Sequence, residues 1–203
     1  MSLRMVTGVL LALSLASAPA LACKGSTTTF HDEFQTEEPS WQALYGEFSV
    51  AEGHARVKSD PNTIALVINT GDYFDGGDLC VDVIAPNYAA GGIQVGGLVF
   101  GLKDDGNYFA VWVSPVDGLV GVVAKKKGEW VMPVPGRRSD AIKKEAGAAN
   151  QLRVSWKSSR AVVYVNDKQF AAFAMAPMKN AHFGIWAQTE GNTWQYDNYK
   201  ITD

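Results

Sequence analysis

The sequence predicts an all-β domain, built as a two-sheet antiparallel jelly-roll sandwich. Short segments rich in β-branched and aromatic residues recur along the chain, with turn residues between them. No segment keeps an apolar period of 3.6 residues beyond one helical turn. Roughly a dozen strands are more than one open twisted sheet holds comfortably, whereas two stacked sheets bury an inner face each.

The expected strands follow one another from residue 28 to the end of the chain. They cover residues 28–34, 47–51, 54–58, 63–68, 79–84, 93–102, 108–113, 120–124, 129–134, 151–157, 161–165, 169–174, 182–188 and 195–201. Most connections, such as residues 104–107 and 166–167, are short and built from turn residues, so neighbouring strands are expected to be antiparallel. Residues 135–149 are expected to form a surface loop or a single helical excursion.

The first 22 residues have the pattern of a signal peptide. Arg4 supplies a positive charge, residues 6–15 are mostly apolar, and Ala20-Leu21-Ala22 forms a small-x-small cleavage site. The apolar run is shorter than the ~20 residues that a membrane span needs. We therefore expect residues 1–22 to be removed and residues 23–203 to form one periplasmic or secreted β-sandwich domain without a transmembrane segment.

Two cysteines, Cys23 and Cys80, allow two interpretations. In an oxidising compartment they would form a disulfide across a long loop, which stabilises by about 4 kcal/mol in the chain-entropy model. Alternatively, Cys23 is lipidated, which resembles bacterial lipoprotein processing. That processing usually requires Leu three residues before the cysteine, where this chain has Ala20. The disulfide is the favoured interpretation.

The charge pattern argues against nucleic acid as a partner. The formal net charge is −3, and basic residues gather only in small groups such as 125–127 and 137–138. A protein that tracks a phosphate backbone needs a larger basic surface.

Several motifs spread over residues 30–199 carry a family resemblance. They are Phe30-His31-Asp32-Glu33-Phe34 with Trp41, Gly96-Gly97-Leu98-Val99-Phe100 with Asp105-Gly106-Asn107-Tyr108, Leu152-Arg153-Val154 with Tyr164-Val165-Asn166-Asp167, and Phe183-Gly184-Ile185-Trp186 with Tyr196-Asp197-Asn198-Tyr199. On these motifs the chain resembles the concanavalin A-like lectin/glucanase superfamily, and within it the laminin-G-like bacterial domains that include the 3-keto-disaccharide hydrolase group. The resemblance implies a jelly-roll sandwich, with carbohydrate binding or a glycoside-directed hydrolysis as its function.

The glucanase branch of that superfamily is similar in fold but carries an E-x-D-x-x-E strand, which this sequence lacks. Retaining glycosidases need two carboxyl groups about 5 Å apart, and alternate positions of one strand supply that spacing. The nearest match is Asp78 and Asp82 on either side of Cys80, and we do not expect it to be a catalytic pair. The histidines lack metal-type spacing, and no serine or cysteine lies in a nucleophile elbow, so no catalytic residue is assigned.

Aromatic residues supply the candidate ligand site. Strand alternation places Tyr108 and Trp112 on one face of their strand, and Trp186 and Gln188 on one face of theirs. Sugar rings present apolar C–H faces and polar hydroxyl rims, which suit aromatic side chains surrounded by amides. The expected ligand-binding residues are Tyr108, Trp112, Trp186, Gln188, Asn192 and Trp194. The alternative is that these aromatic rings fill the sandwich interior or cover a sheet edge.

Calcium is the one cofactor that the sequence suggests. Asp32 would meet Asp197 and Asn198 if the first and last strands pair, and carboxylate and amide oxygens are ligands of Ca²⁺. Asp72, Asp75 and Asp78 form a second, local acidic loop. For both sets the alternative is turn chemistry, in which these side chains bind nearby backbone.

The leading hypothesis is an exported, lectin-like protein whose partner is a carbohydrate or glycoconjugate. A glycoside hydrolase of the 3-keto-disaccharide type is the first alternative, and would require a convergent polar pocket. A structural or interaction domain of the cell envelope is the second, and would present a flat apolar patch.

Overall fold

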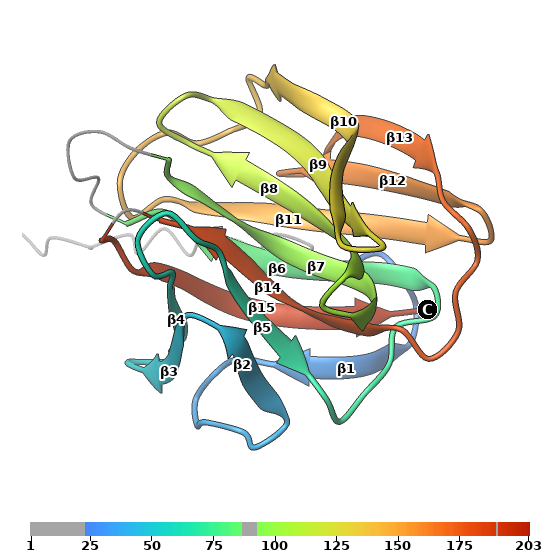
Figure 1. The fold of residues 1–203 in the computed structure, drawn as a ribbon, viewed down its shortest axis with the longest axis horizontal. Coiled ribbons are helices and arrows are strands. Elements are labelled where there is room, and N and C mark those ends of the chain that lie inside the picture. Colours follow the sequence, from blue (N-terminus) through green and yellow to red (C-terminus); the bar gives the residue numbers. More distant parts are fainter. Residues whose placement is uncertain (1–22, 87–92, 190) are drawn as a thin grey trace, which may run out of the picture.

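The computed structural model describes residues 23–86, 93–189 and 191–203, and the regular elements in these ranges are fifteen β-strands. They form two antiparallel sheets that overlie one another (Figure 1). The predicted all-β sandwich is therefore confirmed. The predicted signal peptide, residues 1–22, lies outside the described residues. Within the described ranges, no helix has the length and apolar character needed to cross a membrane.

One sheet has seven strands in the order β10-β9-β8-β7-β14-β5-β2. Its strands are β2 (Trp41–Tyr45), β5 (Ala65–Asn69), β7 (Val95–Asp104), β8 (Asn107–Ser114), β9 (Leu119–Lys126), β10 (Glu129–Arg138) and β14 (His182–Gln188). The edge strands are β2 and β10, which come from distant parts of the sequence.

The other sheet has eight strands in the order β13-β12-β11-β6-β15-β4-β3, and β1 also pairs with β15. Its strands are β1 (Thr28–Asp32), β3 (Glu47–Ala51), β4 (His54–Lys58), β6 (Gly77–Ile84), β11 (Ala149–Lys157), β12 (Arg160–Val165), β13 (Lys168–Ala174) and β15 (Trp194–Thr202). The disulfide predicted between Cys23 and Cys80 is present, with a Cα–Cα distance of 5.8 Å, and it joins the segment before β1 to β6.

The main core lies between the sheets and takes alternate residues of each strand. Val81 and Leu152 of one sheet and Leu98 and Ile185 of the other are completely buried in it. This follows from the period-two geometry of strands, which sends every second side chain to the same face.

The two outer faces differ in chemistry. On the eight-stranded sheet the outer face is polar, and Arg153 and Lys200 flank Cys80 there by register. On the seven-stranded sheet the outer face carries a second apolar cluster, which includes Val99, Tyr108 and Trp186. A β-sandwich needs only its inner faces to be apolar. The fold alone therefore does not account for the apolar cluster on the outer face of the seven-stranded sheet.

Two local features differ from the sequence prediction. β2 was not expected, because its five residues carry no clear alternation and lie between Pro39 and Gly46. β10 extends to Arg138, whereas the predicted strand ended at residue 134. Residues 139–148 form turns and irregular backbone, which agrees with the expected surface loop and not with the helical alternative.

Candidate functional site

A groove of about 920 Å³ crosses the outer face of the seven-stranded sheet. Leu44 and Tyr45 at the end of β2 line one side of it, and Trp130 and Met132 of β10 line the other. Because β2 and β10 are the opposite edges of this sheet, the sheet must curve so that both edges approach the same hollow. The second apolar cluster described above supplies part of its floor, through Trp186.

The floor of the groove contains the indole of Trp186, which is 4% exposed. Its N–H and the hydroxyl of Tyr108 are both buried and lack a well-formed hydrogen bond. Burial raises the pKa of Tyr108 well above its ordinary value, and the neighbouring indole N–H of Trp186 partly offsets that effect. The polar atoms of both residues are thus withdrawn from solvent, so that Trp186 offers the groove an apolar surface.

β10 supplies a rim of three consecutive apolar residues. Trp130, Val131 and Met132 are 50%, 37% and 66% exposed. A regular strand would send Val131 to the opposite face, but the pairing of β10 with β9 shifts register after Val131. The rings of Trp130 and Tyr108 pack edge to face, with their centroids 6.0 Å apart. The ammonium group of Lys125 lies 5.9 Å from the centroid of the Trp130 ring. The exposed indole is therefore held in place on one side.

The opposite rim depends on a sharp corner at Gly46, where β2 ends and the chain crosses to β3 in the other sheet. Gly46 has φ +78°, and a Cβ there would lie 2.5 Å from the carbonyl oxygen of Lys58. The Tyr45 hydroxyl donates a hydrogen bond to Asp105 in the β7–β8 turn. This hydrogen bond raises the pKa of Tyr45, with smaller contributions from burial and from the Asp105 charge.

Polar groups gather where β4 connects to β5. Asp60, Asn62 and Thr63 of this connection line the groove together with Gln188 at the end of β14. The connection is anchored because the Ser59 hydroxyl donates a 2.8 Å hydrogen bond to the Thr189 carbonyl and accepts one of 3.0 Å from the Thr189 amide. Carboxylate, amide and hydroxyl groups thus join the apolar side chains of the groove lining, which also includes Lys125.

The structure brings together part of the predicted ligand site. Tyr108 and Trp186 belong to one cluster, and Gln188 lines the groove beside Trp186. Trp112 packs against the same cluster and is half-buried. The strand faces predicted for these four residues agree with the structure.

Trp194 and Asn192 do not join them. Trp194 begins β15 of the eight-stranded sheet, points into the core and is completely buried. A Cβ on Gly96 would come within 2.4 Å of its indole, so this glycine makes room for the ring. For Trp194 the alternative interpretation, a ring that fills the interior, describes the structure. Asn192 lies in the β14–β15 connection, half-buried, and is not part of the groove lining.

Asp32 and Asp197 of the first calcium set accept hydrogen bonds from within the fold. β1 pairs with β15 as expected, but both carboxylate oxygens of Asp32 are used, one by the Phe34 amide and one by the Trp41 indole N–H, each at 2.7 Å. Asp197 accepts a hydrogen bond from the Asn198 amide, and burial raises its pKa. Among the described residues, no group of three or more His, Cys, Asp or Glu could hold a metal ion.

Two residues of the second acidic set, Asp75 and Asp78, are likewise engaged within the fold. Asp75 accepts a 3.2 Å hydrogen bond from the Ala181 amide. Asp78 forms a 3.0 Å ion pair with Arg153, which is 5% exposed. Asp78 and Asp82 flank the disulfide cysteine Cys80.

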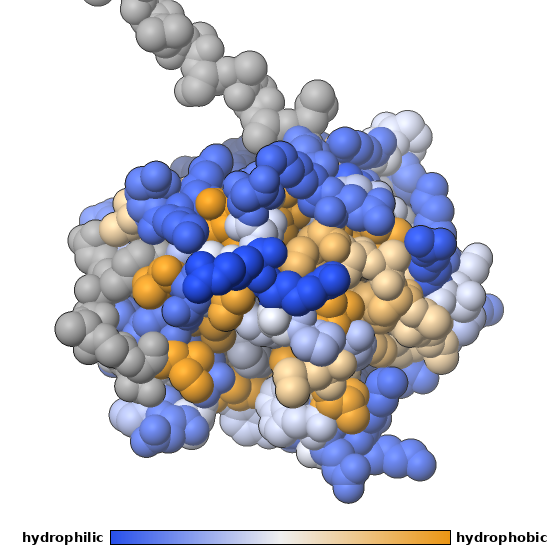
Figure 2. All heavy atoms as spheres, turned by 90° about the horizontal axis from the view of Figure 1, so that it is seen from above, coloured by the Kyte–Doolittle hydropathy of each residue, from blue (hydrophilic) through white to orange (hydrophobic). Residues whose placement is uncertain are grey.

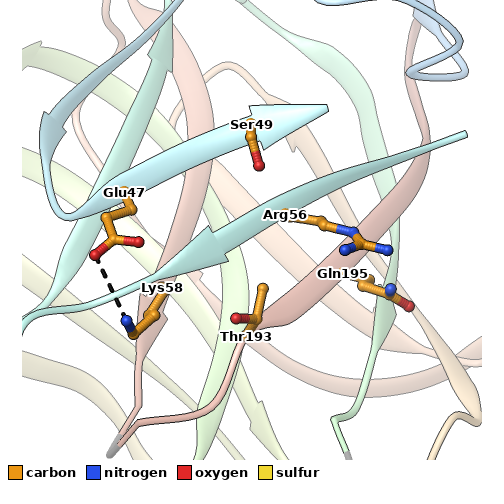
Figure 3. A pocket seen from close by; sticks show the side chains of 6 residues that line it. All are labelled: Glu47, Ser49, Arg56, Lys58, Thr193 and Gln195. Carbon is orange, nitrogen blue, oxygen red and sulfur yellow. Dashed lines mark ion pairs between the residues drawn. The ribbon is translucent and has the colours of Figure 1, made fainter. Parts of the chain in front are cut away.

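A second, smaller hollow of about 280 Å³ lies against β3, β4 and β15 of the other sheet. Its lining is polar throughout, and its Lys58 and Glu47 form a 3.5 Å ion pair (Figure 3). It offers no aromatic surface. The large groove is therefore the stronger candidate site.

The groove residues that sequence reasoning missed include Tyr45, Trp130 and Met132. Tyr45 lies on the strand that was not predicted. Trp130 and Met132 could have been found, because three consecutive large apolar residues directly after a hairpin turn break the alternation of a strand with one wet face. The face of the molecule seen from above the view of Figure 1 carries hydrophobic residues beside strongly hydrophilic ones (Figure 2).

Comparison with known proteins identifies solved structures with a similar fold. No protein-family profile matches the sequence, and no curated protein matches it. Among solved structures, carbohydrate-binding module CBM66 from Bacillus subtilis is similar with a TM-score of 0.66 and 15% identity, over 80% of this chain and 96% of that one. A Bacillus licheniformis β-glucanase is similar with a TM-score of 0.63 and 10% identity, over 88% and 99%.

A third similar structure is the exoplasmic/lumenal domain of VIP36 in a Ca²⁺- and Man3GlcNAc-bound form, with a TM-score of 0.57 and 14% identity, over 81% of this chain and 83% of that one. The chain therefore has a concanavalin A-like, galectin-like sandwich fold, as its sequence motifs indicated. At these identities the likeness concerns the fold, and the function must be argued from the groove.

Proposed function

We propose that this chain is an exported carbohydrate-binding protein that holds its ligand in the groove on the outer face of the seven-stranded sheet. The observation that carries the proposal is that one groove has an exposed tryptophan on its rim and a mostly buried tryptophan in its floor. Trp130 is 50% exposed on the rim, and Trp186 supplies an apolar floor. Carbohydrate-binding domains among the proteins of similar fold support the same ligand class.

The chemistry of the groove suits a sugar. Aromatic faces stack on the apolar C–H faces of pyranose rings, whereas hydroxyl groups need hydrogen-bond partners at the rim. Asp60, Asn62 and Gln188 provide acceptors and donors in the groove lining. The volume of about 920 Å³ also falls within the range of roughly 300–1,000 Å³ that is usual for ligand sites.

A binding function is better supported than hydrolysis of the 3-keto-disaccharide type. General acid–base cleavage of a glycoside commonly uses two carboxyl groups that face the same bond. Among the described residues that line the groove, Asp60 alone carries a carboxyl group. The hollow shape of the surface also favours a small ligand over the flat contact expected of an envelope interaction domain.

Export is supported by the signal-peptide pattern of residues 1–22 and by the disulfide, since disulfides persist in oxidising compartments. The Cys23 sulfur is bonded to Cys80. Lipid attachment would need the same sulfur atom. We therefore favour a periplasmic or secreted protein without a lipid anchor.

The test is a glycan array, followed by titration calorimetry, on protein expressed as the full chain and purified after export. Trp130→Ala should weaken binding of any bound glycan at least about fivefold, because stacking contributes on the order of 1 kcal/mol or more. Tyr73→Ala is the matched control, since Tyr73 is 54% exposed and lies outside the groove lining. Absence of glycan binding, or equal losses in both variants, would contradict the proposal.

A further inference from the structure

The Trp112 indole packs against two glycines, one on β9 and one on β10. A Cβ on Gly121 of β9 would come within 2.6 Å of the Trp112 ring, and one on Gly136 of β10 within 2.7 Å. Neither glycine has the left-handed φ that would demand glycine for its own backbone. Because neither glycine has a side chain, the indole can approach the sheet surface closely.

The register places Trp112 in line with the groove. Gly97 of β7 pairs with Trp186 on one side and with Trp112 on the other, and Trp112 pairs with Gly121. Trp186 and Trp112 are therefore two strands apart on one row that runs across the sheet, a backbone separation of about 10 Å. Gly97 places no side chain between them.

Trp112 and Trp186 belong to one apolar surface, and Val123, on the far side of Trp112 from Trp186, connects that surface to the groove lining. Val123, which lines the groove, follows Gly121 as the next residue on the same face of β9. Trp112 and Val123 both pack against the apolar cluster that contains Trp186. Trp112 is half-buried, as expected for a ring with one face on the sheet.

We propose that Trp112 forms a second stacking platform beside the groove, in the same row as Trp186, so that the ligand is an oligosaccharide chain rather than a single sugar. This inference rests on the proposed function and adds the ligand's length and direction. One part of the chain occupies the groove, and a later residue of the same chain stacks on Trp112.

The test uses β-1,3- and β-1,4-linked gluco- and manno-oligosaccharides of one to six residues, titrated calorimetrically. In the series that binds, affinity should rise at least about tenfold between the disaccharide and the tetrasaccharide or pentasaccharide, because a second aromatic contact is added. Trp112→Ala should remove that rise and leave disaccharide affinity within about twofold of the parent protein.

Gly136→Ala provides an independent variant that leaves Trp112 in place. Gly136 is exposed on the edge strand, so alanine there should preserve folding while it displaces the indole. We expect the same loss of the chain-length dependence, with thermal unfolding checked in parallel. Circular dichroism of the tryptophan bands would report the movement of the ring.

Three results would overturn the inference. The first is equal affinity for disaccharide and hexasaccharide in the parent protein, which would leave the proposed function intact. The second is a Trp112→Ala variant that keeps the full rise or loses disaccharide binding equally. The third is absence of binding to every oligosaccharide in these series; if the glycan array also shows no binding, the proposed function fails as well.

Discussion

The hydroxyl of Tyr45 donates a 2.5 Å hydrogen bond to the carboxylate of Asp105, and so joins the edge strand β2 to the β7–β8 turn. In the sheet order β14 and β5 lie between these two elements. The bond therefore fixes the position of one rim of the groove relative to the strands that form its floor.

Tyr45→Phe should weaken ligand binding about two- to fivefold, because the ring remains while its anchor to Asp105 is lost. Both residues are exposed, so the free energy of unfolding should change by less than about 0.5 kcal/mol. Calorimetric titration and urea unfolding of the same preparation would measure the two effects. A loss of stability without a change in affinity would show that the contact serves the fold alone.

Alkaline pH should destabilise the protein through its buried tyrosines. Burial raises the pKa of Tyr108, Tyr196 and Tyr199 well above the value of 10 expected in an unfolded chain. A raised pKa favours folding fully below pH 10, and this contribution is lost as the pH rises towards the folded-state pKa. Urea unfolding at pH 8, 10 and 11 should show a falling free energy of unfolding.

The matching spectroscopic measurement follows tyrosinate absorbance during titration of the native protein. Of the seven tyrosines in the chain, these three should remain protonated near pH 10.5 and ionise only on unfolding. Simultaneous ionisation of all seven near pH 10 in the folded protein would refute the prediction.

Loss of the disulfide should destabilise the chain by about 4 kcal/mol, since Cys23 and Cys80 are 57 residues apart and the link restricts the unfolded state. The double variant Cys23→Ser, Cys80→Ala avoids a remaining free thiol. Denaturation of this variant, beside the oxidised and reduced parent protein, would measure the effect. Equal stability of all three forms would mean that the link adds nothing to folding.

The ion pair between Asp78 and Arg153 predicts a distinctive double-mutant result. Asp78→Ala leaves the buried guanidinium of Arg153 without its carboxylate partner, and should cost about 3–5 kcal/mol of stability. Combining it with Arg153→Met, which removes the charge, should recover part of that loss. Additive losses from the two substitutions would contradict the idea that the penalty comes from an unpaired charge.

Strand alternation made much of the fold predictable. The expected segments 47–51, 54–58 and 182–188 match β3, β4 and β14 residue for residue. The same alternation correctly placed Tyr108 and Trp112 on one face and Trp186 and Gln188 on one face. These are local relationships, which period-two geometry determines without knowledge of the sheet order.

Other parts of the site depend on relationships that local pattern does not contain. Trp194 was expected beside Trp186, but the strand that it begins belongs to the other sheet, so its side chain enters the core. Tyr45 and Trp130 lie 85 residues apart in sequence and line one groove because the sheet curves. Curvature and sheet membership arise from the packing of the whole sandwich.

The disulfide also determines how the protein can be presented to a large ligand. Cys23 is fastened to the outer face of the eight-stranded sheet, and the amide of Ser26 donates a 2.8 Å hydrogen bond to the carbonyl of Asp203, so both ends of the described chain emerge together there. The groove opens on the opposite side of the sandwich. A protein immobilised or fused through either end would therefore turn its groove outward, towards a polysaccharide surface, without a long linker.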